Sequence, residues 1–331
     1  MIRRDTEKLS LPEGRRAGQP GHAIALQYLE SRMKEIGLIP FKNNDFSLPY
    51  GSFTNLAGVL EGTDETALPV LIGAHYDSAI DAPCSDDNAV SVALILSIAE
   101  TLSKHTLERS VIFAFFDAEE YPYFLKENMG SVRFYNDHCT DIDFACVIIL
   151  DMVGHDFQLG FPIADTLIPG IKQLLFILGS ESHERLPGIV EHALSETRKL
   201  RIIPTLNRYF GDRSDHYVFR KAGKPYLFIS KGWGKYSHSS KDDINWINFE
   251  AVKRIKDFLI RILMLLDEAQ MESGRVAVDP CEYEIRMMKK AVGWFLPFLL
   301  LFMGFYRMSL RSRDDLDTLA EKLSNQFDLA K

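Results

Sequence analysis

A series of short apolar runs separated by longer amphipathic stretches limits most strongly what this chain can fold into. Several of the short runs are apolar at every position, which is typical of strands buried on both faces of a sheet. Strands that alternate with helices predict an α/β fold, here a three-layer α/β/α sandwich with a mixed, mainly parallel central sheet. The predicted strands are residues 55–60, 70–75, 110–116, 144–150, 202–206 and 225–230.

Helices are predicted where apolar residues repeat at helical spacing, as Leu29 and Met33 do. The predicted helices are residues 21–36, 88–102, 131–136, 167–178, 189–200, 215–222 and 249–269. Residues 272–280 are polar, contain a glycine and form the best candidate linker. The chain is therefore predicted to consist of a main domain, residues 1–271, and a C-terminal helical appendage, residues 281–331.

The appendage contains one long apolar segment, residues 291–306 (AVGWFLPFLLLFMGFY), with Lys289 and Arg307 close to its two ends. A helix of this length reaches about 24 Å, which is short of the roughly 30 Å hydrocarbon core of a bilayer. Pro297 would also kink such a helix. We therefore expect a buried or dimer-forming segment, and the positive flanks leave contact with a membrane open as the alternative.

The net charge limits which partners are expected, and the cysteines indicate the cellular compartment. The formal net charge of -8 offers no basic field that could neutralise a phosphate backbone, so nucleic acid is not expected as a partner. The polar residues that follow the basic start of the chain do not resemble a secretory signal. The four cysteines are too few and too scattered for a disulfide framework, which favours a cytoplasmic protein.

Ionisable side chains follow directly after several predicted strands and open one predicted helix. They are His75, Asp77, Asp86, Asp87, Asp117, Glu119, Glu120, Asp151 and His238. Ligands of α/β sheets bind beyond the carboxyl ends of the strands, so these side chains are expected at one edge of the sheet. Taken singly, each has an ordinary structural explanation. Asp86 and Asp87, for example, would serve as a helix N-cap.

The joint occurrence of these residues, in order along one predicted sheet edge, indicates a functional site. Imidazole and carboxylate ligands without a thiolate suit hydrolytic zinc, whose catalytic sites keep one position open for water. A zinc-dependent hydrolase is therefore the class that the residues favour.

Several pieces of the sequence resemble, in order and spacing, the motifs of metallopeptidase family twenty-eight. That family includes aminopeptidases, and glutaminyl cyclases are similar to it. The pieces are His75-Tyr76-Asp77-Ser78, Ser85-Asp86-Asp87-Asn88-Ala89, Phe116-Asp117-Ala118-Glu119-Glu120, Asp151-Met152-Val153-Gly154, Ser214-Asp215-His216 with Gly223-Lys224-Pro225, and His238 with Asp242. The resemblance extends over about residues 14–269.

The resemblance implies a centre that holds two zinc ions. His75 and Asp151 would bind one zinc, Glu120 and His238 would bind the other, and Asp87 would bridge them. A single zinc is expected instead if the chain is similar to the glutaminyl cyclases.

The resemblance also implies a zinc-dependent exopeptidase that removes N-terminal residues from peptides with a free N-terminus. Glu119 would be the general base that activates a metal-bridged water, and Asp77 would orient the imidazole of His75. A homo-oligomer is a further partner that the apolar segment of the appendage leaves open.

Two alternatives to the peptidase remain. Val90 departs from the family pattern and resembles the glutaminyl cyclases, so a glutaminyl-peptide cyclotransferase is the first alternative; of the three tryptophans, only Trp233 is placed near His238. Asp215 either matches a cyclase residue that assists catalysis or serves as a helix N-cap. A non-catalytic binding domain is the second alternative, although all the ligand positions are intact.

The other histidines are expected to have structural or surface roles, because no acidic or histidine partner lies at ligand spacing in the sequence. They are His22, His105, His138, His183 and His192. His155 follows Asp151 closely and could line the pocket.

Overall fold

The centre of the protein is a sheet that has nine strands in the described part of this computed structural model. The structure describes residues 1–42, 45–158, 165, 170–197, 199–272, 278–293, 296–302 and 309–327. The strands are β1 (Ile39–Pro40), β2 (Ser47–Tyr50), β3 (Phe53–Leu60), β4 (Val70–His75), β5 (Val111–Phe116), β6 (Cys146–Asp151), β7 (Leu174–Leu178), β8 (Arg201–Thr205) and β9 (Tyr226–Ser230). Their order is β1-β3-β5-β4-β6-β9-β7-β8, and β2 pairs with β3.

The middle of the sheet is parallel and its edges are mixed. Strands β5, β4, β6 and β9 are parallel neighbours, whereas β3 is antiparallel to β5 and β7 is antiparallel to β9. Every residue of β4, β5 and β6 is buried, as the continuous apolar runs predict for strands covered on both faces. The predicted mixed, mainly parallel sheet is confirmed.

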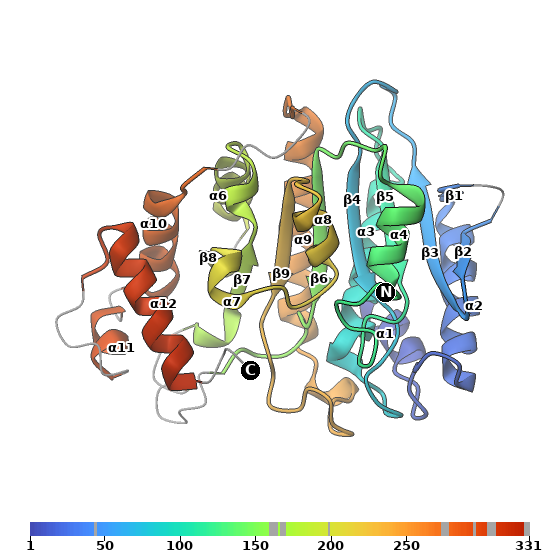
Figure 1. Cartoon of the computed structure of the whole chain (residues 1–331), viewed down its shortest axis with the longest axis horizontal. Coiled ribbons are helices and arrows are strands. Elements are labelled where there is room, and N and C mark those ends of the chain that lie inside the picture. Colours follow the sequence, from blue (N-terminus) through green and yellow to red (C-terminus); the bar gives the residue numbers. More distant parts are fainter. Residues whose placement is uncertain are drawn as a thin grey trace.

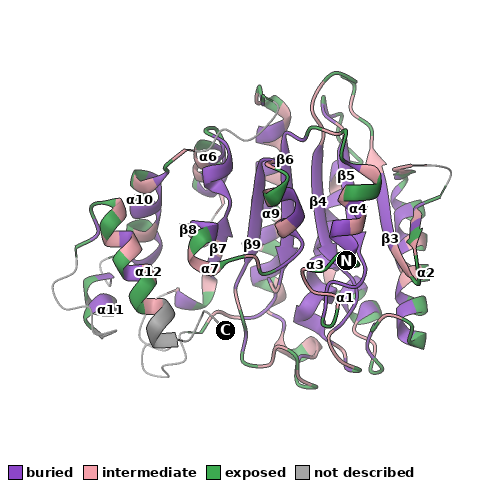
Figure 2. Cartoon of the chain, viewed as in Figure 1, coloured by how far each residue is buried: buried purple, intermediate pink, exposed green. Residues whose placement is uncertain are grey.

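Helices cover both faces of the sheet (Figure 1). One face packs against α1 (Ile2–Leu9), α2 (Pro20–Ile36), α3 (Val90–Leu102), α6 (Leu186–Glu196) and α9 (Phe249–Glu268). The other packs against α4 (Gly130–His138) and α8 (His216–Lys221), with the short α7 (Asn207–Phe210) nearby. Figure 2 shows the buried sheet between helices whose outer surfaces are exposed. The predicted three-layer architecture is therefore confirmed.

The local sequence explains where two of these helices begin and end. Helix α2 has Pro20 in its first turn and ends at Gly37, whose positive φ of 84° suits a residue without a side chain. Helix α9 begins after Asn248, whose side chain accepts a hydrogen bond from the backbone N–H of Ala251.

The predicted helix over residues 167–178 is wrong. Residues 167–169 lie outside the described residues, Ile171–Gln173 form one short helical turn, and Leu174–Leu178 form strand β7. This short apolar run pairs with β8 on one side and β9 on the other. Periodicity cannot distinguish a short, wholly apolar strand from a buried helical turn, which is why the pattern misled.

The appendage consists of α10 (Cys281–Val292), α11 (Leu296–Phe302) and α12 (Arg313–Phe327), beyond strand β8 at one end of the sheet (Figure 1). Helix α10 packs along β8, and its Tyr283 and Met287 belong to the main core. Part of the predicted apolar segment, residues 294–295 and 303–306, lies outside the described residues. In the part of the chain that is described, no helix is long and apolar enough to cross a membrane. Contact with a membrane and a cytoplasmic location stay predictions.

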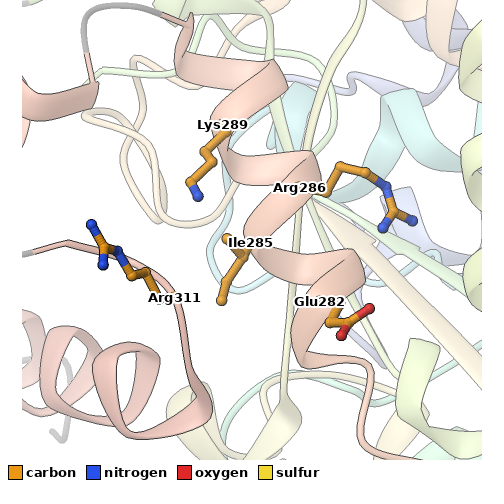
Figure 3. A pocket seen from close by; sticks show the side chains of 5 residues that line it. All are labelled: Glu282, Ile285, Arg286, Lys289 and Arg311. Atoms are coloured by element: carbon orange, nitrogen blue, oxygen red, sulfur yellow. The ribbon is translucent and has the colours of Figure 1, made fainter.

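A cavity of about 460 Å³ lies beside α10. It is lined by Glu282, Ile285, Arg286, Lys289 and Arg311, and by none of the predicted site residues. Figure 3 shows Lys289 and Arg311 on the same side of α10, whereas Arg286 turns away from them. The guanidinium of Arg286 donates to both carboxylate oxygens of Glu191 on α6, at 3.1 and 2.6 Å.

Candidate metal centre

The predicted site residues converge at the carboxyl ends of the parallel strands. His75 is the last residue of β4, and Asp151 is the last residue of β6. Glu119 and Glu120 lie in the loop after β5, and His238 lies in the loop after β9. Asp87 lies in the segment Ser85–Ala89, which leads into α3 and whose backbone is not helical at Asp87 itself. Parallel strands bring these separate segments to one edge, as the sequence predicted.

Asp87 lies between two histidines. Its Oδ1 is 3.3 Å from Nε2 of His75, and its Oδ2 is 3.0 Å from Nε2 of His238. Asp151 approaches the first imidazole at 3.6 Å, and Glu120 approaches the second at 3.3 Å. Two sets of potential ligand atoms therefore meet at this one carboxylate, each set lying within 4.8 Å.

Several polar atoms of this centre are buried without a hydrogen-bond partner in the part of the chain that is described. Nε2 of His75, Oε1 of Glu120 and Oδ1 of Asp151 are buried and, within the described residues, lack a partner in hydrogen-bond geometry. Buried polar atoms are normally paired, so close approach without hydrogen-bond alignment fits donors that surround a cation. Imidazole and carboxylate donors suit zinc. The residues present therefore fit a zinc centre.

The electrostatics of the centre are those of crowded buried carboxylates. Burial, reinforced by Asp87, raises the pKa of Glu120 to about 7. Burial also raises the pKa of Asp151. Asp87 is the exception, because His238 and His75 lower its pKa although burial acts in the opposite direction. Contact with Asp87 and then Glu120 raises the pKa of His238 to about 10.

Glu119 lies beside the ligand atoms. Its Oε2 is 4.0 Å from Nε2 of His75, and its Oε1 is buried without a hydrogen-bond partner among the described residues. Burial raises its pKa well above the usual value, and the charge of Glu120 adds to the shift. A buried carboxyl group that favours its protonated form can accept and return a proton.

Asp77 contacts the ring of His75 and the loop that carries Glu119 and Glu120. Its Oδ1 is 3.3 Å from Nδ1 of His75, on the far side of the ring from Asp87. The same carboxylate accepts hydrogen bonds from the backbone N–H groups of Glu119 and Glu120, at 3.1 and 3.2 Å. Asp77 and His75 lie close, but Nδ1 of His75 has no partner in hydrogen-bond geometry among the described residues, so the orienting role of Asp77 stays a prediction. The contact with the glutamate loop was missed because it depends on how two strands lie side by side.

Polar side chains also fasten the turn that holds Asp87. Asp242 accepts hydrogen bonds from the backbone N–H groups of Asp86 and Asp87, at 2.8 and 3.1 Å. Asn88 donates to the carbonyl of Leu150 at 3.0 Å. The turn is thereby joined both to the His238 loop and to the end of β6, and the side chains of the site are positioned by bonds within the protein.

The sequence did not predict the buried contacts that two side chains near the site make. His22, expected to have no acidic partner, has its Nε2 2.9 Å from Oδ1 of the buried Asp117. Arg15 is fully buried, and its guanidinium donates to the carbonyls of Tyr76 and Cys84. Neither sequence position shows a spacing signal, because both contacts join segments that are far apart in the chain.

Asp215 directly precedes α8, but its side chain makes no capping hydrogen bond. It is completely buried, and this burial raises its pKa to about 7. The N-cap explanation for Asp215 therefore loses its physical basis.

Aromatic rings stand at the exposed side of the site. The indole of Trp233 lies edge-on to the imidazole of His238, with ring centroids 4.7 Å apart, and is 67% exposed. Tyr121, directly after Glu120, is 84% exposed. An exposed ring that packs against a site residue, as that of Trp233 does against His238, is suited to contact an apolar part of a substrate.

An α/β sheet with this donor set at its carboxyl edge is the architecture of a metal-dependent hydrolase. The sequence profile of Peptidase family M28 matches residues 55–263. The chain therefore belongs to this metallopeptidase family, as the sequence motifs predicted.

Individual relatives show how far this likeness extends. Endoplasmic reticulum metallopeptidase 1 of Homo sapiens is 36% identical over 240 residues, which is 68% of this chain but only 24% of that protein. The LapA aminopeptidase of Legionella pneumophila has a similar structure, with a TM-score of 0.65, 18% identity, and coverage of 81% of this chain and 72% of that one. The glutaminyl cyclase of Porphyromonas gingivalis gives a TM-score of 0.63 at 19% identity, with coverage of 81% and 96%.

Proposed function

We propose that the protein is a zinc-dependent exopeptidase that removes N-terminal residues from peptides. The observation that carries this proposal is the position of Asp87, whose two carboxylate oxygens face two different histidines. Each imidazole has a second carboxylate beside it, and two of the three sets of donors, His75 with Asp151 and Glu120 with His238, share Asp87; the third set is His75, Glu119 and Glu120. A carboxylate shared in this way supports a site for a pair of metal ions.

In this proposal, His75 and Asp151 would hold one zinc, Glu120 and His238 would hold the other, and Asp87 would contribute to both. Zinc supplies Lewis acidity there, which lowers the pKa of water and polarises a carbonyl oxygen. The remaining chemistry belongs to side chains that are not metal ligands.

Glu119 acts as the general base. Its carboxylate accepts the proton of the attacking water, and the same carboxyl group then donates that proton to the leaving amine. The raised pKa of Glu119, caused first by burial, keeps the proton available for this second step. Asp77 holds the backbone of Glu119 and faces the ring of His75, so it positions the base and one ligand together.

The substrate in this proposal is a peptide with a free N-terminus. A free α-amino group beside the zinc that Glu120 and His238 would hold, and beside the nearby carboxylates, would explain cleavage at the N-terminus. The exposed rings of Trp233 and Tyr121 would contact the side chain of the first residue.

Activity screening tests the proposal directly. Purified protein with zinc should hydrolyse aminoacyl-nitroanilides, and N-acetylation of the same substrates should abolish hydrolysis. Protein that binds zinc but cleaves none of these substrates would contradict the exopeptidase activity.

A glutaminyl-peptide cyclotransferase is the second candidate. It is favoured by two observations, the buried Asp215 with its pKa raised to about 7 by burial, and the indole of Trp233 beside His238. A peptide that begins with glutamine separates the two activities, because cyclisation releases ammonia whereas hydrolysis releases free glutamine. The single-zinc alternative is checked by the metal content of the same sample.

A non-catalytic binding domain is the third candidate. It predicts that the purified protein holds little zinc even when zinc is supplied, which metal analysis would detect. Self-association through the appendage is a separate proposal, tested by sedimentation of the full chain at several concentrations.

A further inference from the structure

A buried aspartate–histidine pair lies beside the proposed metal centre and belongs to none of its ligands. Nδ1 of His155 is 2.6 Å from Oδ2 of Asp86, and both side chains are buried. Oδ1 of Asp86 accepts hydrogen bonds from the backbone N–H groups of Gly154 and His155, at 2.7 and 3.2 Å. Because Asp86 precedes Asp87, these bonds fasten the Asp87 turn to the loop that follows Asp151.

The imidazole of His155 also contacts the loop that carries His238. A Cβ atom on Gly234 would lie 3.3 Å from both Cε1 and Nδ1 of the ring, so this loop passes directly against it. The ammonium group of the buried Lys231, where the same loop leaves β9, donates to the carbonyl of His155 at 2.5 Å. The ring of Trp246 lies nearly parallel to the imidazole, at 8° and 5.9 Å.

The chemistry of the contact requires a ring nitrogen that carries a proton. Asp86 already accepts two backbone N–H groups at Oδ1, and the tautomer of His155 with its proton on Nδ1 donates to the other oxygen, Oδ2. The approach is close enough that a Cβ on Gly154 would come within 2.8 Å of Oδ1 of Asp86. His155 therefore contributes in two ways: its Nδ1 contacts Asp86, and its flat ring packs against Gly234 and Trp246.

We propose that His155 is a positioning residue that sets the separation of the two metal sites. It does so by joining the segments of Asp87 and Asp151 to the loop of His238, and this inference rests on the proposed two-zinc function. Displacement of one segment relative to another would change the distance between the two ligand sets that share Asp87. Residues that orient metal ligands in this way affect metal affinity without touching the metal.

Two substitutions separate the donor from the ring. His155→Phe keeps a flat ring against Gly234 and Trp246 but cannot donate to Asp86. His155→Asn places an amide N–H near the position of Nδ1 but has no ring. We expect His155→Phe to weaken binding of at least one zinc by about tenfold to a hundredfold, and His155→Asn to recover most of that loss.

The measurements are zinc affinity by competition with a chromophoric chelator, and the visible spectrum of the cobalt-substituted protein, which reports ligand geometry. The matched control is His192→Phe, because His192 is exposed and also faces a carboxylate, Glu196, at 3.1 Å. The control should leave both measurements unchanged. A His155→Phe protein that binds both zincs with unchanged affinity and cobalt spectrum would overturn the inference and leave the proposed function standing.

A second variant keeps the test decisive if His155→Phe does not fold. Gly234→Ala adds one methyl group against the imidazole, and Gly188→Ala adds one into open space on α6 as its control. We expect weaker zinc binding and an altered cobalt spectrum only for Gly234→Ala. Equal behaviour of these two variants would also overturn the inference. If the unaltered protein itself binds no zinc, the proposed function fails instead.

Discussion

Two regions of the molecule treat buried acidic groups in opposite ways. At the carboxyl edge of the sheet, Glu119, Glu120 and Asp151 are buried close together, and the cationic groups placed against them are imidazoles. In the appendage, the buried carboxylate of Glu284 contacts the guanidinium of Arg313. Buried charge is costly unless it is paired, and only in the second region does an always-charged guanidinium face the buried carboxylate. The comparison indicates that the first is built to receive a cation.

The largest effect expected from this comparison is on turnover. Glu119→Gln should lower turnover by at least about a hundredfold, because it removes a positioned base. Zinc content should stay unchanged, since Glu119 is not a ligand in the proposed centre. Glu120→Gln is the matched control and should deplete zinc. Simultaneous loss of metal and activity in Glu119→Gln would mean that the roles of the two glutamates are reversed.

Asp87→Asn tests the shared carboxylate. An amide has only one oxygen to offer. It therefore cannot place one oxygen in the ligand set of His75 and another in the ligand set of His238, as a carboxylate can. We expect disturbed binding of both zinc ions, measured as metal content after dialysis. Asp137→Asn, at a surface residue paired with Arg133, should retain the full content. Two tightly held zincs in Asp87→Asn would remove the bridging role.

Removal of metal from the first region should lower the thermal stability of the protein. A ligand present at about a thousandfold its dissociation constant stabilises the folded state by about 4 kcal/mol, so chelation should lower Tm by several degrees. The difference in Tm between the metal-loaded and the metal-free protein should grow with pH. His238 must lose its proton to bind zinc, and its pKa is raised to about 10 by Asp87 and Glu120. Between about pH 7 and that value, zinc affinity should therefore rise with pH. A Tm difference that is independent of pH would contradict this.

The sequence predicted the middle of the sheet better than its margins. Strands β4, β5 and β6 are continuous apolar runs, and this pattern arises because they are buried on both faces. Strand β1 has only two residues and β2 contains Pro49, so neither carries a usable period. Strand β7 carries an apolar run, but so short a run does not distinguish strand from helix.

For the site, the sequence predicted which side chains would meet but not what holds them. His75, Asp87 and His238 each follow or open a predicted element, so their common edge follows from the topology of the sheet. The contacts of Asp242 with the Asp87 turn, and of His155 with Asp86, join segments far apart in the chain. Such contacts depend on loop conformation, which no local pattern encodes.

In the second region, the expected effects are on stability alone. Arg313 contacts Asp279 and Glu284, and it donates to the hydroxyl of Tyr209 at 3.2 Å. Arg313→Ala should destabilise the protein by about 1 to 3 kcal/mol, because it leaves Glu284 buried without its cation. Turnover should not change, and Arg313→Lys should recover part of the loss. Denaturant unfolding measures the effect.

The pH dependence of this variant has a definite sign. Burial raises the pKa of Glu284 to about 7. Below that pH the carboxyl group is protonated in the folded state and needs no cation. The stability deficit of Arg313→Ala should therefore be larger at pH 8 than at pH 5.5. A deficit that is larger at the lower pH would contradict the proposed pairing.

The smallest effect is expected at Arg286. This residue lies on the exposed side of α10 and pairs with Glu191 of α6. The two side chains are 54% and 32% exposed, so water and salt screen their attraction. Arg286→Ala should change the free energy of unfolding by less than about 1 kcal/mol, and raising the salt concentration should shrink the difference further. Arg286 and Arg313 both lie in the appendage and both bind carboxylates, but Arg313 is the more buried and has three partners, whereas Arg286 pairs with Glu191 of α6. If the two alanine variants were equally destabilised, burial would not be what distinguishes them, and the contrast with the metal centre would lose its physical basis.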